Sequence, residues 1–294
     1  IQTTNGQPVI VAPIDGSPAQ RAGLRPGDII LKVDDEDTIG LPLSQVVERI
    51  LGLAGTPVKL TILNPRSGLT REITLVRARI TLQNVTWERL PNMSVVHLRI
   101  MTFSQGVSKT LRKTLSTIQE EGSGGLILDL RNSPGGRYDE AIHSASQFLS
   151  SGNILLEKDA SGKITPVLAW PGGVALTVPM VVLINGGTSS GAEIVAGALQ
   201  DAHRAKLVGE KTFGTGTVLE TFSLPDGSAL MLATKEWLTP AGRVIWHQGI
   251  HPDVLIPLPP EVIPVVPTAE RGMSIAQLRA IGDEQLLRAL DMLT

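Results

Sequence analysis

The N-terminal part of the chain alternates short apolar runs with turn residues. Two β-branched runs, PVIVAPI and DIILKV, flank GSPAQRAGLRPG, and SQVVERILGLAG has the spacing of an amphipathic helix that ends at glycine. VKLTIL and REITLV are strand-like runs separated by NPRSG, which predicts a hairpin. The pattern therefore predicts a compact β-rich module over residues 1–78.

Strand and helix patterns alternate from Ile80 onward. SVVHLRI, GLILDL and VPMVVLI read as buried strands, and the helix-like segments SKTLRKTLSTIQEE and YDEAIHSASQFLSS lie between them. This alternation is typical of a largely parallel α/β layer. Parallel sheets bind ligands at the carboxyl ends of their strands, where RNSPGG and NGGTSSG lie, so this edge is the predicted functional site.

The C-terminal segment is predicted to be helical from Ser274 to Leu293, after the proline-rich stretch IPLPPEVIPVVP. Its apolar positions recur at near-helical spacing: Ile275, Leu278, Ile281, Leu286, Leu290 and Leu293. Such a stripe must be buried. Burial against the same chain and burial in a homo-oligomer both remain open.

Composition and charge narrow the possible partners. The 294 residues include 26 Lys plus Arg and 28 Asp plus Glu, a net charge of -2, and no long basic block predicts a nucleic-acid surface. The chain has no cysteine, which excludes disulfides, thiolate metal sites and a cysteine nucleophile. No run of about 18 apolar residues is present, and because the first residue is Ile1 we expect a signal or anchor upstream.

The stretch GGTSSGAEIVAGAL, residues 186–199, follows an apolar strand and opens a helix. This arrangement brings side chains and free backbone N–H groups to one point, which suits a nucleophile beside an anion-binding site. The simpler interpretation is that Thr188, Ser189 or Ser190 caps the helix. The local pattern alone leaves both interpretations open.

Several separated motifs together resemble one family. GSPAQRAGLRPGDIILKVDD is similar to a PDZ module, and the motifs that follow in family order are ILDLRNSPGG, VVLINGGTSSGAEIVAGALQD, VGEKTFGTGTV, LTPAGRVI and GIHPDV. The chain thus resembles the carboxyl-terminal processing peptidases, or tail-specific proteases, of serine peptidase family S41. The resemblance implies an N-terminally truncated PDZ-like module (1–78), an α/β ClpP/crotonase-like serine peptidase core (79–265) and a helical C-terminal tail (266–294).

The resemblance also implies roles for particular residues. Ser190 falls on the family nucleophile, and Ser189 falls on a small spacer position. The backbone N–H of Gly191, with one from Gly135 or Gly136, would form the oxyanion hole, because glycine lets the backbone approach a tetrahedral intermediate. NSPGG is equally an ordinary turn signal. We expect neither a cofactor nor a metal.

The base position departs from the family pattern. Where the family reads approximately T-F-G-K-G-x-V-Q, with lysine as base and glutamine orienting it, this chain reads TFGTGTVL, so Thr215 and Leu219 occupy those positions. Threonine does not accept the serine proton as an amine does. Lys211 precedes Thr215 by four residues, about 13 Å in an extended strand at roughly 3.3 Å per residue, which is too far for a lysine side chain to replace the base. Four other residues could approach the serine, and solvated surface positions are the simpler expectation for them: Lys235, Glu236, His203 and His247.

Two further charged residues flank the predicted catalytic loops. Arg131 and Glu193 are expected either to form a buried structural pair or to position substrate.

Two functional classes therefore remain. One is a serine endopeptidase that cuts proteins near apolar C-termini, and the other is a catalytically impaired homologue that binds protein tails as an adaptor or regulatory subunit. Family resemblance implies a periplasmic, extracytoplasmic or membrane-associated location through a preceding segment. In the PDZ-like module, we expect the carboxylate-binding loop to be missing or formed by Ile1 to Gly6.

Overall fold

The computed structural model describes residues 1–294 apart from 12, 15, 66, 81–82 and 260–261. Two compact units divide the chain, Ile1–Gln83 and Asn84–Thr294. The boundary between them thus lies at 83/84, where the sequence pattern placed it at 78/79, and the helical C-terminal segment belongs to the second unit. None of the helices in the described ranges combines the length and apolar character that crossing a bilayer requires.

The first unit is one antiparallel sheet with two helices. Its strands follow the order β1-β2-β3-β5-β6, and β4 pairs with β3. Val58, Leu60 and Ile62 alternate along one strand and are buried, as period-two patterning requires. The elements of this unit are β1 (Gln2–Thr4), β2 (Gln7–Val9), α1 (Pro18–Arg21), β3 (Ile29–Val33), β4 (Glu36–Asp37), α2 (Leu43–Ile50), β5 (Pro57–Leu63) and β6 (Thr70–Val76). Pairing of β5 with β6 confirms the hairpin predicted around NPRSG.

The second unit is built on a sheet with strand order β16-β13-β12-β9-β8-β7, parallel except at the β7–β8 pair. This confirms the predicted parallel α/β layer. The elements of its layers are β7 (Val85–Arg89), β8 (Val95–Ile100), α3 (Val107–Glu120), β9 (Gly125–Asp129), α4 (Tyr138–Ala145), β12 (Met180–Ile184), α5 (Gly191–Asp201), β13 (Lys206–Gly209), β16 (Val254–Leu255), α6 (Pro267–Glu270), α7 (Ile275–Ala280) and α8 (Glu284–Asp291).

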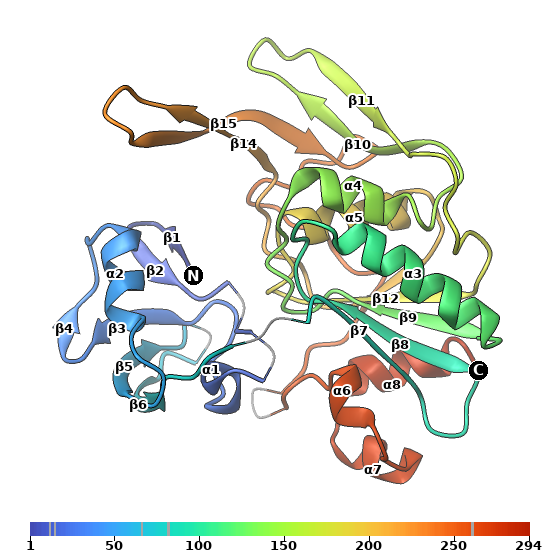
Figure 1. Cartoon of the computed structure of the whole chain (residues 1–294), viewed down its shortest axis with the longest axis horizontal. Coiled ribbons are helices and arrows are strands. Elements are labelled where there is room, and N and C mark those ends of the chain that lie inside the picture. The colour runs from blue at the N-terminus through green and yellow to red at the C-terminus, as the bar shows by residue number, and fades with distance from the viewer. Residues whose placement is uncertain (12, 15, 66, 81–82, 260–261) are drawn as a thin grey trace. The chain divides into compact units, whose positions relative to one another are not determined.

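Helices cover both faces of this sheet (Figure 1). On one face, Val182 and Ile184 of β12 pack in the cluster that includes residues of α3, α4 and α5. On the other face, Val181 and Leu183 of the same strand pack in the cluster that includes residues of α7 and α8. Because successive strand residues point to opposite faces, β12 is apolar throughout.

A smaller antiparallel sheet, which the sequence pattern did not predict, belongs to the same unit. Its strands are β11 (Ile164–Leu168), β10 (Asn153–Lys158), β15 (Ala229–Leu238) and β14 (Thr217–Ser223), in that spatial order. Leu219, Phe222 and Met231 are at least 44 % exposed on the β14–β15 hairpin. Period-two hydrophobicity is weak where both strand faces are exposed, which explains why the pattern did not show these strands.

The prediction of a single helix from Ser274 to Leu293 is wrong. Two helices, α7 and α8, are separated at Gly282, whose φ is +80°, and Asp283 begins the second helix by accepting a hydrogen bond from Leu286 N at 3.1 Å. The apolar stripe is nevertheless buried in its own chain. Its members lie in or against one core cluster under the sheet: Ile275, Leu278, Ile281, Leu286, Leu290 and Leu293.

Candidate active site

Three loops meet beyond the carboxyl ends of β9, β12 and β13. The loop after β12 donates from Ser189 N to Ser133 O, in the loop after β9, at 2.9 Å. The loop after β13 donates from Phe213 N to Thr188 O at 2.9 Å. These backbone bonds hold RNSPGG, NGGTSSG and TFGTG together at the edge where parallel sheets place ligands.

Ser190 occupies the sharp turn between β12 and α5. Its φ of 51° and ψ of −122° lie outside the regions that non-glycine residues favour, and it immediately precedes the first helical residue, Gly191. Strain of this kind is typical of a serine presented on a strand-to-helix turn. The side chain is half-buried, in contrast to the fully buried Ser189 beside it.

Gly135 packs directly against this turn. A Cβ atom on Gly135 would lie 2.6 Å from Gly191 N, from Ser189 O and from Ser190 Cβ, and the φ of Gly135 is +85°. Neither the space nor the backbone conformation admits a side chain. The Gly135 carbonyl accepts hydrogen bonds from Phe103 N and Thr102 Oγ1, both at 2.8 Å, so the loop is fixed against the end of β8.

Two backbone N–H groups, those of Gly136 and Gly191, lie beside the serine turn. A Cβ on Gly191 would lie 3.6 Å from Gly136 N, which places these two glycines next to each other. Within the described parts of the chain, neither the Gly136 nor the Gly191 N–H donates a hydrogen bond. A pair of uncommitted N–H groups beside a serine can hold a developing oxyanion.

Glu193 joins the serine turn to the loop that carries Thr215. Its buried carboxylate accepts four hydrogen bonds, from Ser190 N (3.0 Å), Thr215 N (2.9 Å), Gly214 N (2.7 Å) and Thr212 Oγ1 (2.5 Å). Burial raises the pKa of this carboxyl above its usual value, against the opposing effect of the four donors. Glu193 therefore fixes the distance between two loops of the site.

Thr215, which the resemblance places at the base position, has its side-chain hydrogen bond with Ser189 and not with Ser190. Thr215 Oγ1 lies 2.7 Å from Ser189 Oγ and shares a hydrogen bond with it. Leu219, at the family glutamine position, lies on β14 and is 54 % exposed. No titratable side chain among the described residues has a hydrogen bond to Ser190 Oγ.

Lys235 and Glu236 are committed to ion pairs on the smaller sheet. Lys235 Nζ lies 2.6 Å from Glu157 Oε2, and this hydrogen bond raises the pKa of the lysine. Glu236 Oε2 lies 3.1 Å from Lys158 Nζ. A lysine whose proton is held more firmly than usual is a poor proton acceptor.

The remaining substitutes are exposed. Lys211 follows β13, and His203 lies just beyond the C-terminal end of α5, whereas Ser190 precedes the N-terminal end of the same helix. A helix of this length separates His203 from Ser190 by roughly 18 Å. His247 is nearer in the fold, since its backbone N donates to Gly214 O at 2.9 Å, and its exposed ring packs on Trp246.

Arg131 and Glu193 are both buried, but they do not pair with each other. Arg131 forms ion pairs with Asp129 and Asp283, both at 2.8 Å, and lies on the face of the sheet covered by α8. Glu193 instead binds hydroxyl and N–H donors above the strand ends. One of these partners, Asp283, is 152 residues away from Arg131, so local spacing did not reveal it.

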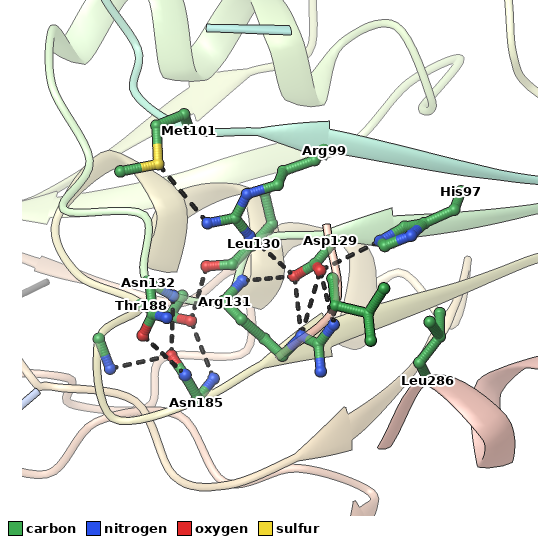
Figure 2. Close-up of polar contacts among 12 residues, drawn as sticks. His97, Arg99, Met101, Asp129, Leu130, Arg131, Asn132, Asn185, Thr188 and Leu286 are labelled. Atoms are coloured by element: carbon green, nitrogen blue, oxygen red, sulfur yellow. Dashed lines mark hydrogen bonds and ion pairs between the residues drawn. The ribbon is translucent and has the colours of Figure 1, made fainter. Parts of the chain in front are cut away.

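Sequence reasoning missed the polar residues that lie beneath the loops (Figure 2). Asn185 Nδ2 donates to Asn132 Oδ1 and Asn185 Oδ1 accepts from Asn132 N, both at 2.9 Å. His97 lies on β8, all of whose residues are buried. Two features of the sequence could have indicated these residues. An asparagine follows each of two parallel strands, and a histidine and an arginine interrupt the apolar run SVVHLRI.

Two protein-family models match this chain. The model of peptidase family S41 matches residues 94–256, and a PDZ domain model matches residues 9–64. The carboxyl-terminal-processing protease of Synechocystis sp. is 37% identical over 297 residues, which cover 100% of this chain and 66% of the relative. The carboxy-terminal processing protease CtpA of Bacillus subtilis is 35% identical over 260 residues, covering 88% and 55%.

Solved structures give the same result. The photosystem II D1 C-terminal processing protease superposes with a TM-score of 0.81 at 31% identity, covering 91% of this chain and 72% of that chain. Mature CPAF, at 16% identity and a TM-score of 0.55, shows the fold alone. This chain spans between about half and two thirds of the length of the curated relatives it matches.

The fold, with a serine on a strained turn beside uncommitted N–H groups, defines a serine peptidase scaffold that follows a PDZ module. The chain belongs to peptidase family S41, and its relatives are carboxyl-terminal processing proteases. The resemblance stated from the motifs is thereby confirmed.

Proposed function

We propose that this chain is a serine endopeptidase of the C-terminal processing type, with Ser190 as nucleophile, whose hydrolytic rate is low because Thr215 replaces the lysine base. The observation that carries the proposal is the strained Ser190 turn beside the N–H groups of Gly136 and Gly191. Its substrates are proteins or peptides with apolar C-termini, which a PDZ module and an extended-peptide groove would bind by strand addition.

The chemistry follows from these groups. Ser190 Oγ attacks the scissile carbonyl carbon, and the carbonyl oxygen gains negative charge that the two N–H groups stabilise. The hydroxyl proton must pass to a base, and then to the leaving amine. Thr215 has a hydroxyl in place of an amine, and that hydroxyl forms a hydrogen bond with the Ser189 hydroxyl. Removing a base costs on the order of 10⁶-fold in rate, while the oxyanion hole keeps a residual acceleration over water.

A second candidate is a protein that binds tails without cutting them, as an adaptor or regulatory subunit. The engagement of Thr215 with Ser189 favours it, as does the ion pair that holds Lys235 on Glu157, because both leave Ser190 without a base. The two candidates share peptide binding and differ in the reactivity of one hydroxyl.

A fluorophosphonate probe separates the two candidates, because it labels only an activated serine. We expect slow labelling that disappears in Ser190→Ala and persists in Ser189→Ala. Absence of labelling, together with binding of a peptide that has an apolar C-terminus, would favour the adaptor. Neither labelling nor peptide binding would overturn both candidates.

Location and assembly are proposed on resemblance alone. We place the protein in the periplasm, or otherwise outside the cytoplasm or at a membrane, because that is what the family resemblance implies. The reaction proposed here uses neither metal nor cofactor. A homo-oligomer would need a surface other than the apolar stripe of α7 and α8, since that stripe is buried in its own chain.

A further inference from the structure

A cluster of six charged side chains lies buried between the main sheet and the C-terminal helices. Each is at most 2 % exposed, and together they comprise three cations and three carboxylates: His97 and Arg99 on β8, Asp129 on β9, Arg131 after β9, Glu270 in α6, and Asp283 before α8. We call this group the tail cluster. The C-terminal segment supplies two of its three carboxylates.

Arg131 lies at the centre of the tail cluster and uses each of its nitrogen atoms. Nε and Nη2 bind Asp129, with the shortest distance 2.8 Å. Nη1 donates to both carboxylate oxygens of Asp283, at 2.8 and 2.9 Å, and to Gln285 Oε1 at 3.3 Å. Nη2 also donates to Val265 O at 3.2 Å. Four C-terminal or strand partners therefore fix one guanidinium.

His97 extends the cluster to α6. Its Nδ1 lies 2.6 Å from Glu270 Oε1 and its Nε2 lies 3.1 Å from Asp129 Oδ2, as the contact with Asp129 in Figure 2 shows. Burial alone would lower the pKa of this imidazole, but the two carboxylates outweigh burial and raise the pKa to about 9. With His97 protonated, the six charges of the cluster sum to zero.

The loop with the candidate oxyanion donors begins one residue after this anchor. Asn132, whose φ is 54°, forms two hydrogen bonds with Asn185, and Ser133 O accepts from Ser189 N. Gly135 then packs against the serine turn. The position of the Arg131 backbone therefore sets where this loop starts.

From these contacts we propose that Arg131 and Asp283 are positioning residues for the oxyanion loop, so that the C-terminal segment takes part in catalysis without touching substrate. Loss of the Asp283 charge leaves a buried guanidinium short of a partner, and such a charge moves toward water or another acceptor. Because Arg131 is adjacent to Asn132, that movement displaces the loop. The effect on catalysis rests on the proposed function. The displacement of the loop itself can be measured in a chain that has no activity.

Asp283→Asn is the direct test, and Asp291→Asn is its matched control. Asparagine at 283 keeps an oxygen for Leu286 N, so α8 still begins there, while its amide N–H₂ faces the Arg131 donors. Asp291 lies in the same helix with half of its side chain exposed, and pairs only loosely with Arg279 at 3.7 Å. The same chemical change is thereby made inside and outside the tail cluster.

Backbone hydrogen exchange measured by NMR or mass spectrometry is the first readout. In Asp283→Asn we expect exchange at Asn132, Ser133 and Ser189 to accelerate by at least about tenfold, with β12 amides unchanged. Asp291→Asn should change neither. Equal acceleration in β12 would mean that Asp283 only stabilises the fold, and unchanged loop exchange would mean that the segment does not position the loop. Either result overturns the proposal.

Two further measurements keep the test decisive. If Asp283→Asn does not fold, Glu270→Gln replaces it, because Glu270 acts on the same cluster through His97; unchanged loop exchange there would contradict the proposal. In a chain with Thr215→Lys and Leu219→Gln, Asp283→Asn should lower kcat by about tenfold with KM unchanged. If the chain with Thr215→Lys and Leu219→Gln is inactive, that result counts against the proposed function alone. The role of Asp283 in positioning the loop is tested separately by the hydrogen exchange.

Discussion

Replacing Glu193 by glutamine tests whether one buried carboxyl holds two loops of the site together. The substitution keeps the size and shape of the side chain and converts one oxygen into an N–H₂ group. In the present structure each carboxylate oxygen accepts two hydrogen bonds, one oxygen from Ser190 N and Thr215 N and the other from Gly214 N and Thr212 Oγ1. If the N–H₂ replaces the oxygen that Ser190 N and Thr215 N reach, both of these donors lose their acceptor. If it replaces the other oxygen, Gly214 N loses its acceptor, whereas the Thr212 hydroxyl can turn and accept from the N–H₂.

The magnitude follows from this geometry. A donor left without an acceptor costs about 1–3 kcal/mol, so one or two such donors predict a loss of about 1–6 kcal/mol in the free energy of unfolding. Ordinary exposed substitutions change this free energy by at most about 0.5 kcal/mol. Glu120→Gln, on the exposed side of α3, is the matched control.

Tryptophan fluorescence during urea unfolding measures the effect. The four tryptophans are Trp87, Trp170, Trp237 and Trp246, and all lie in the second unit, so their signal reports that unit alone. With a slope of about 2 kcal/mol per M urea, the midpoint should fall by about 0.5 M or more in Glu193→Gln. A shift no larger than that of Glu120→Gln would refute the assignment of Glu193 as the link between the loops.

The remaining predictions concern single positions. Gly135→Ala should lower the free energy of unfolding of the second unit by several kcal/mol, because the added Cβ would clash with the serine turn. Gly152→Ala is its control: φ there is +93° and nothing lies within 4 Å of the added Cβ, so the loss in the same urea assay should be only about 1 kcal/mol. His97 has a raised pKa of about 9, so its stabilising charge is fully present below about pH 6.5 and is lost as pH rises through about 9. The free energy of unfolding should therefore fall by about 3 kcal/mol over that window, and His97→Gln should lack this slope. Lys235→Met should leave any cleavage rate within about twofold of its starting value, because the Lys235 ammonium is held by Glu157 and is not the base; a much larger loss would mean that Lys235 is the base.

Much of the fold was readable from the sequence because periodic apolar runs mark β8, β9, β12 and α3. The segments NGGTSSG and NSPGG were also recognisable as one site, since the order of strand, glycines and helix places them at one edge of a parallel sheet. The choice of Ser190 within its segment came from the family resemblance. The break between α7 and α8 was missed, although Gly282 followed by Asp283 is a stop signal followed by a start signal. The apolar stripe continues across these two residues with near-helical spacing, which is why the pattern predicted one helix.

The tail cluster was not predictable by the same means. Arg131 and Asp283 are 152 residues apart, and His97 and Glu270 are 173 apart, so their contacts depend on how the C-terminal helices pack on the sheet. Spacing rules apply to neighbours within one helix or strand pair. The partners of Thr215 and Glu193 depended in the same way on the folding of three loops, which no single stretch of sequence describes.

The central claim is that this chain has a serine peptidase scaffold that lacks only its base. The most direct measurement is cleavage of an unfolded protein with an apolar C-terminus by the starting chain, by Thr215→Lys with Leu219→Gln, and by that variant with Ser190→Ala. Leu219 is 54 % exposed, so glutamine fits there, while lysine at the half-buried Thr215 must displace its hydrogen bond to Ser189, which limits recovery to a partial one. The account predicts that cleavage rises in the double variant and disappears with Ser190→Ala. No rise in a folded double variant, or rapid cleavage by the starting chain, would contradict it.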